Sequence, residues 1–214
     1  MATSGTTTFD MDVAEIVEEA FERCGSEART GYDFRTARRS LNLLFIEWAN
    51  QGVNMWTIDE GIIPLVGGAK TYALPADTID VMDAAIRTGT GALQNDRVLS
   101  RVSFSTYASM PNKELTGRPS IMKIARHDPP SITLWPVPHA MEALSLVYWR
   151  LRRIQDASSG TDTVDMPFRF LPAAIAGLSH KLALKIPEAA TRLPELERQY
   201  ITAWDLATGE DRER

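Results

Sequence analysis

The chain has 214 residues, of which 44% are apolar and 24% charged, so it resembles an ordinary globular protein that can bury its own core. Its formal net charge of −5 gives no electrostatic reason to bind nucleic acid tightly. A single cysteine, Cys24, excludes an internal disulfide and a cysteine-based metal cluster. The chain has no apolar run of about 18 residues and no signal-peptide pattern, so we expect synthesis in the cytoplasm and no membrane segment.

Residues 10–52 show the apolar periodicity of two amphipathic helices. Asp12 is the expected N-cap of the first helix, and Gly25 is its expected end. Cys24 lies on the apolar stripe of this helix, which favours a buried thiol over a reactive one. For the second helix, Asp33 is the expected N-cap.

Arg38 and Arg39 lie near the start of the second helix, where cations oppose the helix dipole. One interpretation is a solvated face on which these arginines pair with nearby acids. The other is a contact with a neighbouring subunit. The first is favoured, and both remain open at this point.

From residue 53 to 155 the pattern changes to short apolar runs separated by Gly and Pro. A short helix is expected at 103–109. The region as a whole predicts a small antiparallel sheet or barrel. Strands are expected at 70–74, 81–87, 120–125, 131–135 and 143–151. The last of these has large groups on both faces and is therefore expected at the centre of a sheet or in an interface.

Helical periodicity returns at residues 165–208, after a polar loop at 155–166. Asp165 is a candidate cap, and Pro172 indicates that the third helix either starts late or bends. The fourth helix is expected from Pro194 to beyond Trp204, followed by a charged tail.

The predicted fold class is therefore α+β. N- and C-terminal helix pairs (10–52 and 165–208) are expected to form a four-helix bundle with an inserted antiparallel β domain (53–155). Residues 209–214 are the charged tail.

A search for chemistry finds no convergent site. His127, His139 and His180 belong to no metal-ligand pattern, and there is no nucleophile elbow or P-loop. Asp80 and Asp83 are expected on opposite faces of a strand. With 28 acids, some carboxylate pair will always meet a glycosidase spacing, so that signal is empty. We expect no enzyme activity, no catalytic residues, no metal and no cofactor.

Arg150, Arg152 and Arg153 follow Trp149, and cations beside an aromatic ring can bind single-stranded nucleic acid. The other interpretation is the exposed end of a strand. No RNA-binding signature accompanies the cluster, so the exposed strand end is favoured.

The stretch Thr36–Thr57 resembles part of the head-to-tail adaptors of short-tailed phages, the tubular tail and DNA-stabilising head-completion proteins. The motif is an Arg before Leu41-Asn42, then Glu47-Trp48, then Gly52 and Trp56. Two later stretches resemble the same proteins, Tyr72-Ala-Leu-Pro-Ala-Asp77 and Ile132-Thr-Leu-Trp-Pro-Val-Pro138. The resemblance spans about residues 10–210 and is weakest after Asp156.

This resemblance implies a virion protein at the head–tail junction, a homo-oligomeric and commonly dodecameric ring between the portal protein and the tail nozzle or tail fibre proteins. Genomic DNA would pass through its lumen without sequence-specific binding. Five tryptophans, more than a small monomer needs, agree with subunit interfaces. The candidate subunit or portal contacts are Arg38, Arg39, Trp56, Arg150, Arg152, Trp204, Arg212 and Arg214.

Two alternatives from other classes remain. One is a peptidoglycan hydrolase carried in the virion, which would need two carboxylates in a cleft. The other is a nucleic-acid-binding regulator, which the net charge disfavours.

Overall fold

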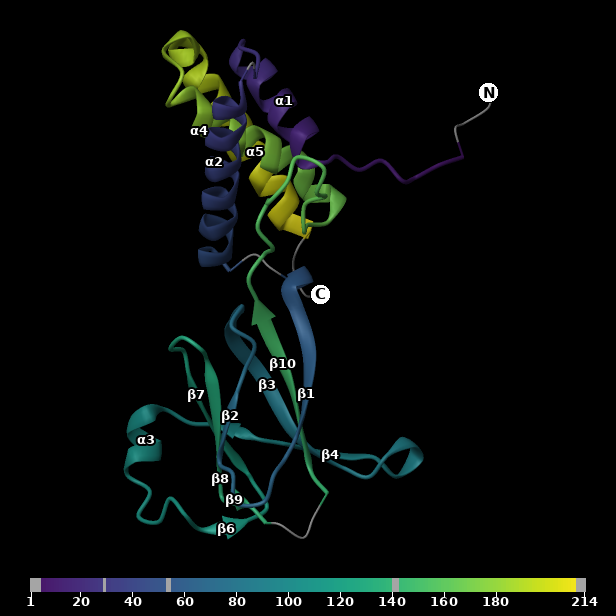
Figure 1. Cartoon of the computed structure of the whole chain (residues 1–214), viewed down its shortest axis with the longest axis vertical. Helices are drawn as coiled ribbons and strands as arrows, with labels where there is room; N and C mark the ends of the chain where they lie inside the picture. The colour runs from purple at the N-terminus through teal and green to yellow at the C-terminus, as the bar shows by residue number, and fades with distance from the viewer. Residues whose placement is uncertain (1–4, 29, 53–54, 140–142, 211–214) are drawn as a thin grey trace. The chain divides into compact units, whose positions relative to one another are not determined.

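The computed structural model describes residues 5–28, 30–52, 55–139 and 143–210 (Figure 1). The chain divides into two compact units. Met1–Trp56 and Ile154–Arg214 form the first, which we call the helical unit, and Thr57–Arg153 form the second, which we call the β unit. The protein is therefore of mixed α and β class with antiparallel sheets, as the sequence predicts.

The helical unit contains α1 (Val13–Cys24), α2 (Gly31–Asn50), α4 (Leu171–Ala183) and α5 (Leu193–Glu210). Two 3-10 turns, η3 (Phe168–Phe170) and η4 (Pro187–Arg192), precede α4 and α5. Figure 1 shows α1 and α2, from the start of the chain, beside α4 and α5 from its end.

The predicted caps of α1 are confirmed. The side chain of Asp12 accepts a hydrogen bond from the Glu15 amide at 2.8 Å, and the Asp12 amide donates to the Glu15 carboxylate at 3.0 Å. Gly25 ends the helix in the left-handed conformation, with φ of 77°.

The predicted cap of α2 is wrong by three residues. Thr30 is the N-cap, and Asp33 is the reciprocal third residue of a second capping box. The Thr30 amide donates to the Asp33 carboxylate at 3.0 Å, and the Asp33 amide donates to the Thr30 hydroxyl at 3.2 Å. Both residues can cap a helix, and the apolar pattern alone does not distinguish the two starts.

The helix α4 starts late and does not bend at its proline. Pro172 occupies the first turn, where a missing amide hydrogen leaves no helical bond unmade. Asp165 is therefore not its cap, because the N-cap is Phe170 at the end of η3. The helix ends at Ala183, and Pro187 begins η4.

All four long helices contribute to one hydrophobic core. Trp48 is fully buried, and Cys24 is 3% exposed, as its place on the stripe predicts. The Cys24 thiol lies 3.2 Å from the carbonyl oxygen of Ser179, and burial raises its pKa. A buried thiol that resists ionisation is a poor nucleophile.

The first sheet of the β unit has the order β1-β10-β3-β4, with every neighbouring pair antiparallel. Its strands are β1 (Ile58–Pro64), β10 (Ser145–Arg152), β3 (Thr78–Thr88) and β4 (Asn95–Val98). The predicted strand at 143–151 is thus confirmed as central. A 3-10 turn, η2 (Gly91–Leu93), lies between β3 and β4, and another, η1 (Met55–Thr57), precedes β1.

The second sheet has the order β2-β8-β7-β5. It comprises β2 (Thr71–Ala73), β8 (Ser131–Trp135), β7 (Ile121–Ala125) and β5 (Ser100–Arg101), and α3 (Phe104–Ala108) follows β5. The strands β5 and β7 run parallel, and so do β6 (Thr116–Gly117) and β9 (Val137–Pro138). The expected antiparallel pairing is confirmed for most strands, but the described strands form two larger sheets and a small ladder, with two parallel pairs among them.

The two larger sheets share one core. The central strands β10 and β3 contribute Leu146 and Ile86, and β8 contributes Ile132 from the other sheet, all fully buried. Alternation along β10 directs Leu146 and Tyr148 into this core and Val147 to the opposite face. The large groups on both faces of this strand reflect its central position.

Candidate functional site

The Arg and Asn of the phage-like motif bind the backbone of the loop at 155–166. Asn42 donates to the carbonyl oxygen of Ala157 at 3.2 Å and accepts from the Ala157 amide at 2.8 Å. One turn earlier, Arg38 donates to the carbonyl oxygen of Ser158. Arg38 and Asn42 are four residues apart on α2 and therefore share a helix face. This face ties the N-terminal half of the helical unit to its C-terminal half.

The Glu-Trp pair of the motif has a similar internal role. Glu47 forms an ion pair with Lys181 of α4 at 2.6 Å. The indole of Trp48 donates to the Tyr200 hydroxyl of α5 at 3.0 Å. The Glu-Trp pair of the motif thus corresponds to contacts of α2 with both C-terminal helices.

The aromatic candidates pack into the same core. The Trp56 indole donates to the carbonyl oxygen of Asp165 at 2.9 Å, and its ring lies 4.6 Å from that of Phe170. The Trp204 ring lies 4.9 Å from that of Trp48. Both side chains are half-buried. Their size is therefore explained in large part by packing within the subunit.

The remaining candidates of the helical unit differ in position. Arg39 is exposed on α2, next to the internally bonded Arg38. Arg38 bonds a backbone carbonyl and not the nearby acid that the favoured interpretation supposed. Arg212 and Arg214 lie outside the described residues.

Of the predicted basic cluster, Arg153 is exposed just beyond the end of β10, as the favoured interpretation expects, but Arg150 and Arg152 are not. The side chains of Arg150 and Arg152 are only 13% and 14% exposed. Arg150 pairs with Asp77 at 2.5 Å, and Arg152 pairs with Asp59 at 3.1 Å. Asp59 and Asp77 lie far from these arginines in the sequence, so local patterns could not reveal the pairing.

These ion pairs keep their carboxylates charged. The hydrogen bond from Arg150 lowers the pKa of Asp77 below its usual value, and the hydrogen bond from Arg87 does the same to the pKa of Asp96. Such carboxylates are unsuited to act as general acids, which need a raised pKa.

A second charged cluster joins the two sheets of the β unit. Asp80 of β3 accepts hydrogen bonds from Arg101 of β5, at 3.0 and 3.2 Å, and from Arg126 beyond β7. Burial would raise the pKa of Asp80, but the two arginines outweigh it and the pKa is lowered. Asp83 is exposed on the same strand and is not part of this cluster. The sequence marked Asp80 only as half of an uninformative acid pair.

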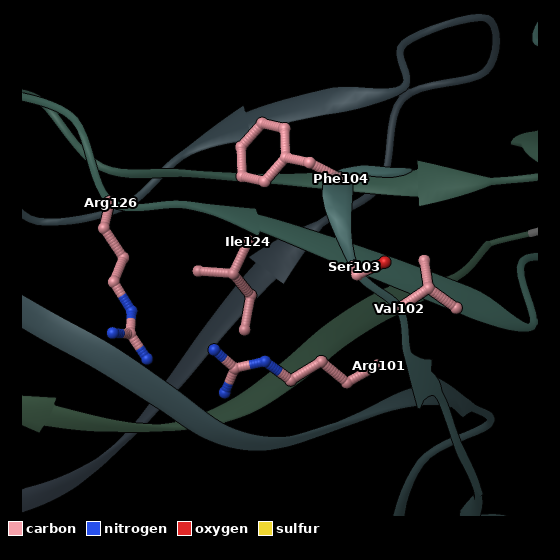
Figure 2. A pocket seen from close by; sticks show the side chains of 6 residues that line it. All are labelled: Arg101, Val102, Ser103, Phe104, Ile124 and Arg126. Atoms are coloured by element: carbon pink, nitrogen blue, oxygen red, sulfur yellow. The ribbon is translucent and has the colours of Figure 1, made fainter. Parts of the chain in front are cut away.

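A cavity of about 480 Å³ opens beside this cluster, lined by Arg101, Val102, Ser103, Phe104, Ile124 and Arg126. Figure 2 shows the two guanidinium groups reaching toward each other, with Ile124 between them and the ring of Phe104. The amino group of Lys123 lies 4.8 Å from the centre of that ring. Because Asp80 engages both arginines, the cluster is accounted for as a tie between sheets.

The three histidines take no part in the charged clusters described above. His127 and His139 are exposed, and His180 is half-buried with its ring stacked 6.4 Å from that of Tyr200. Within the described residues, no group of three or more His, Cys, Asp or Glu side chains could bind a metal ion. No helix in the same part of the chain is long and apolar enough to cross a membrane.

An apolar groove of about 920 Å³ lies on the helical unit, between α1, α4 and the chain before α1. Phe9 and Phe168 border it and are each 77% exposed. Its floor includes Leu171 and Ile175. Most of the side chains that line this groove are apolar.

The described part of the chain combines internal ion pairs, a buried thiol and exposed apolar side chains. The family comparison is specific: residues 11–214 match the model described as SU10 adaptor protein. The chain belongs to this family of phage adaptor proteins. No curated protein matches the chain.

Proposed function

We propose that this chain is the subunit of a homo-oligomeric, commonly dodecameric ring in the phage virion, between the portal protein and the tail nozzle or tail fibre proteins. Genomic DNA would leave the head through the lumen of this ring. The match to a phage adaptor family over residues 11–214 carries the proposal. Membership of that family implies a virion component that interacts with portal and tail proteins.

The helical unit is proposed to act as a four-helix bundle, and the β unit (57–153) is inserted in the chain between its two helix pairs. The single core shared by α1, α2, α4 and α5 supports this assignment. The hydrogen bonds of Asn42 and Arg38 to the loop at 155–166 support it too, because they join the two halves of the bundle. A rigid bundle is a suitable platform for docking on a larger assembly.

The candidate contacts are refined by their positions. Arg39 remains a proposed portal or subunit contact because its side chain is exposed. Arg212 and Arg214 remain proposed contacts in the charged tail. Arg38, Arg150 and Arg152 already have partners inside the subunit, and Trp56 and Trp204 pack in its core, so we expect them to shape the interface indirectly.

The two alternative functions find less support. A peptidoglycan hydrolase needs one carboxyl group with a raised pKa, and the pKa values of Asp77, Asp80 and Asp96 are instead lowered. A nucleic-acid regulator would use the cluster around Arg150 and Arg152, whose guanidinium groups are largely buried against acids. The family is a structural phage protein family, which agrees with no enzyme activity.

The decisive experiment is to mix the purified full chain with the portal protein of its phage and image the mixture by negative-stain electron microscopy. Rings attached to one end of the portal are the expected result. A chain that stays unbound to the portal at micromolar concentration contradicts the proposal. Peptidoglycan zymography and salt-dependent DNA binding on the same preparation test the two alternatives, and both are expected to be negative.

A further inference from the structure

A row of apolar residues crosses the first sheet of the β unit from one edge to the other. Ile62 of β1 is paired with Val147 of β10, Val147 with Ala85 of β3, and Ala85 with Val98 of β4. Val147 and Ala85 are buried, yet neither belongs to the core between the sheets. The two ends of the row are exposed, Ile62 by 55% and Val98 by 70%. The row therefore ends in an apolar side chain at each edge.

The backbone of Ile62 faces away from its neighbour β10. The Leu65 amide donates to the carbonyl oxygen of Leu144 at 2.8 Å, so these two residues form a hydrogen-bonded pair that continues the β1–β10 register. Bonded and non-bonded pairs alternate along an antiparallel ladder. Three residues from Leu65, Ile62 is in a non-bonded pair, and its N–H and C=O point to the open edge.

The backbone of Val98 has the same parity at the other edge. The Leu99 amide donates to the carbonyl oxygen of Ala84 at 2.8 Å, which makes that pair hydrogen-bonded and the adjacent Val98–Ala85 pair non-bonded. The N–H and C=O of Val98 therefore also point outward. Strand order places β1 and β4 at opposite edges of this sheet.

We propose that β4 of one copy pairs with β1 of the next copy, so that the sheet continues from subunit to subunit. Successive strands of this sheet alternate in direction, so β4 and the β1 of a neighbour would be antiparallel. Opposing Val98 to Ile62 makes this a hydrogen-bonded pair and extends the apolar row across the boundary. The inference rests on the proposed ring and names the surface that builds it.

This register is also compatible with the neighbouring side chains. With Val98 opposite Ile62, Arg97 is opposite Ile63 and Asp96 is opposite Pro64, so no two like charges face each other. Pro64 has no N–H, so the pair with Asp96 lacks one of its two backbone hydrogen bonds. Charged residues and proline commonly protect an open edge, and here Arg97 of β4 and Pro64 of β1 flank the row, while the row itself ends in Ile and Val. Because two different edges meet, the contact is head-to-tail, the type that closes into rings.

A cysteine pair tests the contact directly. In the full chain carrying Cys24→Ala, Ile62→Cys and Val98→Cys are introduced together, and the protein is assembled with its portal and oxidised. Within one subunit the two positions are three strand spacings apart, about 14 Å, which is too far for a disulfide. Between paired copies they would be about 5.5 Å apart. We expect a ladder of covalently linked subunits on a non-reducing gel.

The controls separate this contact from others. Either cysteine alone should leave the subunit monomeric on the gel, because a dimer from Val98→Cys alone would mean that two identical edges meet and would overturn the proposal. The matched control carries Val66→Cys together with Val98→Cys and keeps Ile62. Val66 is an exposed apolar residue of the same unit, outside the row. This pair is expected to give no ladder.

A second variant does not depend on oxidation. Val98→Lys places a charge at the open edge, at a side chain exposed enough for folding to be retained, and is expected to reduce ring formation at least tenfold. Val66→Lys, the matched control, should leave it unchanged. Rings that form normally with Val98→Lys, or that stay unlinked with the cysteine pair, overturn this inference and leave the adaptor function standing. A wild-type chain that forms no ring on its portal overturns the adaptor function itself.

Discussion

At the scale of single residues, side chains distant in sequence join the parts of each unit. Asn42 does so with both functional groups of its amide, one accepting from and one donating to the backbone of Ala157. Asp80 does so in the β unit, where it accepts hydrogen bonds from Arg101 of β5 and from Arg126, which follows β7. In the sequence, Asn42 stands out only through its place in a phage-like motif, and its physical role is to satisfy a partly buried loop backbone.

Truncating Asn42 should therefore destabilise the helical unit. Asn42→Ala leaves the amide and the carbonyl of Ala157 without their partner, which costs about 1–3 kcal/mol. Urea unfolding followed by tryptophan fluorescence measures the loss. Asn42→Asp keeps the acceptor and loses the donor, so its stability should lie between that of the wild type and that of Asn42→Ala. Equal stability of wild type and Asn42→Ala would show that water replaces both bonds.

Acid should weaken the β unit through its paired carboxylates. The pKa values of Asp77, Asp80 and Asp96 are lowered in the folded protein, so these groups bind protons more weakly than in the unfolded chain. Their stabilisation is therefore complete above the ordinary aspartate pKa of 3.8 and is lost as pH falls through the lowered values. Thermal unfolding from pH 7 to pH 2.5 should show the melting temperature falling below about pH 4.

The variant Asp80→Asn isolates one of these groups. It should melt below the wild type at pH 7, because Arg101 and Arg126 lose their shared charged partner. The difference between the two proteins should shrink below pH 4, where protonation removes the same charge from the wild type. A difference that stays constant across this range would mean that the charge of Asp80 is not what the arginines require.

At the scale of elements, the pairing of β1 with β10 depends on a close approach between a glycine and an aromatic ring. Gly61 of β1 lies against the ring of Tyr148 on β10. A Cβ atom at Gly61 would lie 2.3 Å from the Cζ atom of Tyr148. The ring is 4% exposed and belongs to the core between the sheets, so it has little room to move.

Gly61→Ala should consequently destabilise the β unit by about 1–3 kcal/mol, the usual cost of forcing an extra methyl group into a packed core. Chemical denaturation monitored by far-ultraviolet circular dichroism gives the value. Gly31→Ala is the control, because open space surrounds that glycine in the first turn of α2. It should be neutral or slightly stabilising, since Ala is a better helix former.

At the scale of the whole molecule, the chain enters and leaves the β unit through adjacent strands. Ile58 of β1 is paired with Leu151 of β10, so the two ends of the unit lie side by side. The β unit also has its own core. A unit with neighbouring ends and a separate core can be removed from its host without cutting either core.

Residues 57–153 expressed alone are therefore expected to fold. The isolated fragment should unfold in one cooperative urea transition and keep its strand signal in circular dichroism. A fragment that is unfolded at neutral pH would mean that the β unit needs the helical unit to be stable. Such a result would also make the first-sheet edges unavailable for study outside the full chain.

Local signals predicted the elements well because they act over a few residues. The Asp12–Glu15 capping box, Gly25 and the apolar stripes each depend on neighbours within one or two turns. The Thr30 cap was missed because Asp33 satisfies the same preference. The parallel pairs β5–β7 and β6–β9 were missed because strands of two residues leave no periodic pattern to detect.

The sequence by itself determined the mixed α and β class, the helix–helix–β–helix–helix order, the buried thiol and the resemblance to phage adaptors, since each is written in composition, periodicity or motif. Only the tertiary structure decided which charges are internal. Arg150 and Arg152 read as an exposed basic cluster until Asp59 and Asp77 are brought beside them. It also aligned Ile62 with Val98 across four strands, because strand order and register depend on pairings between distant segments.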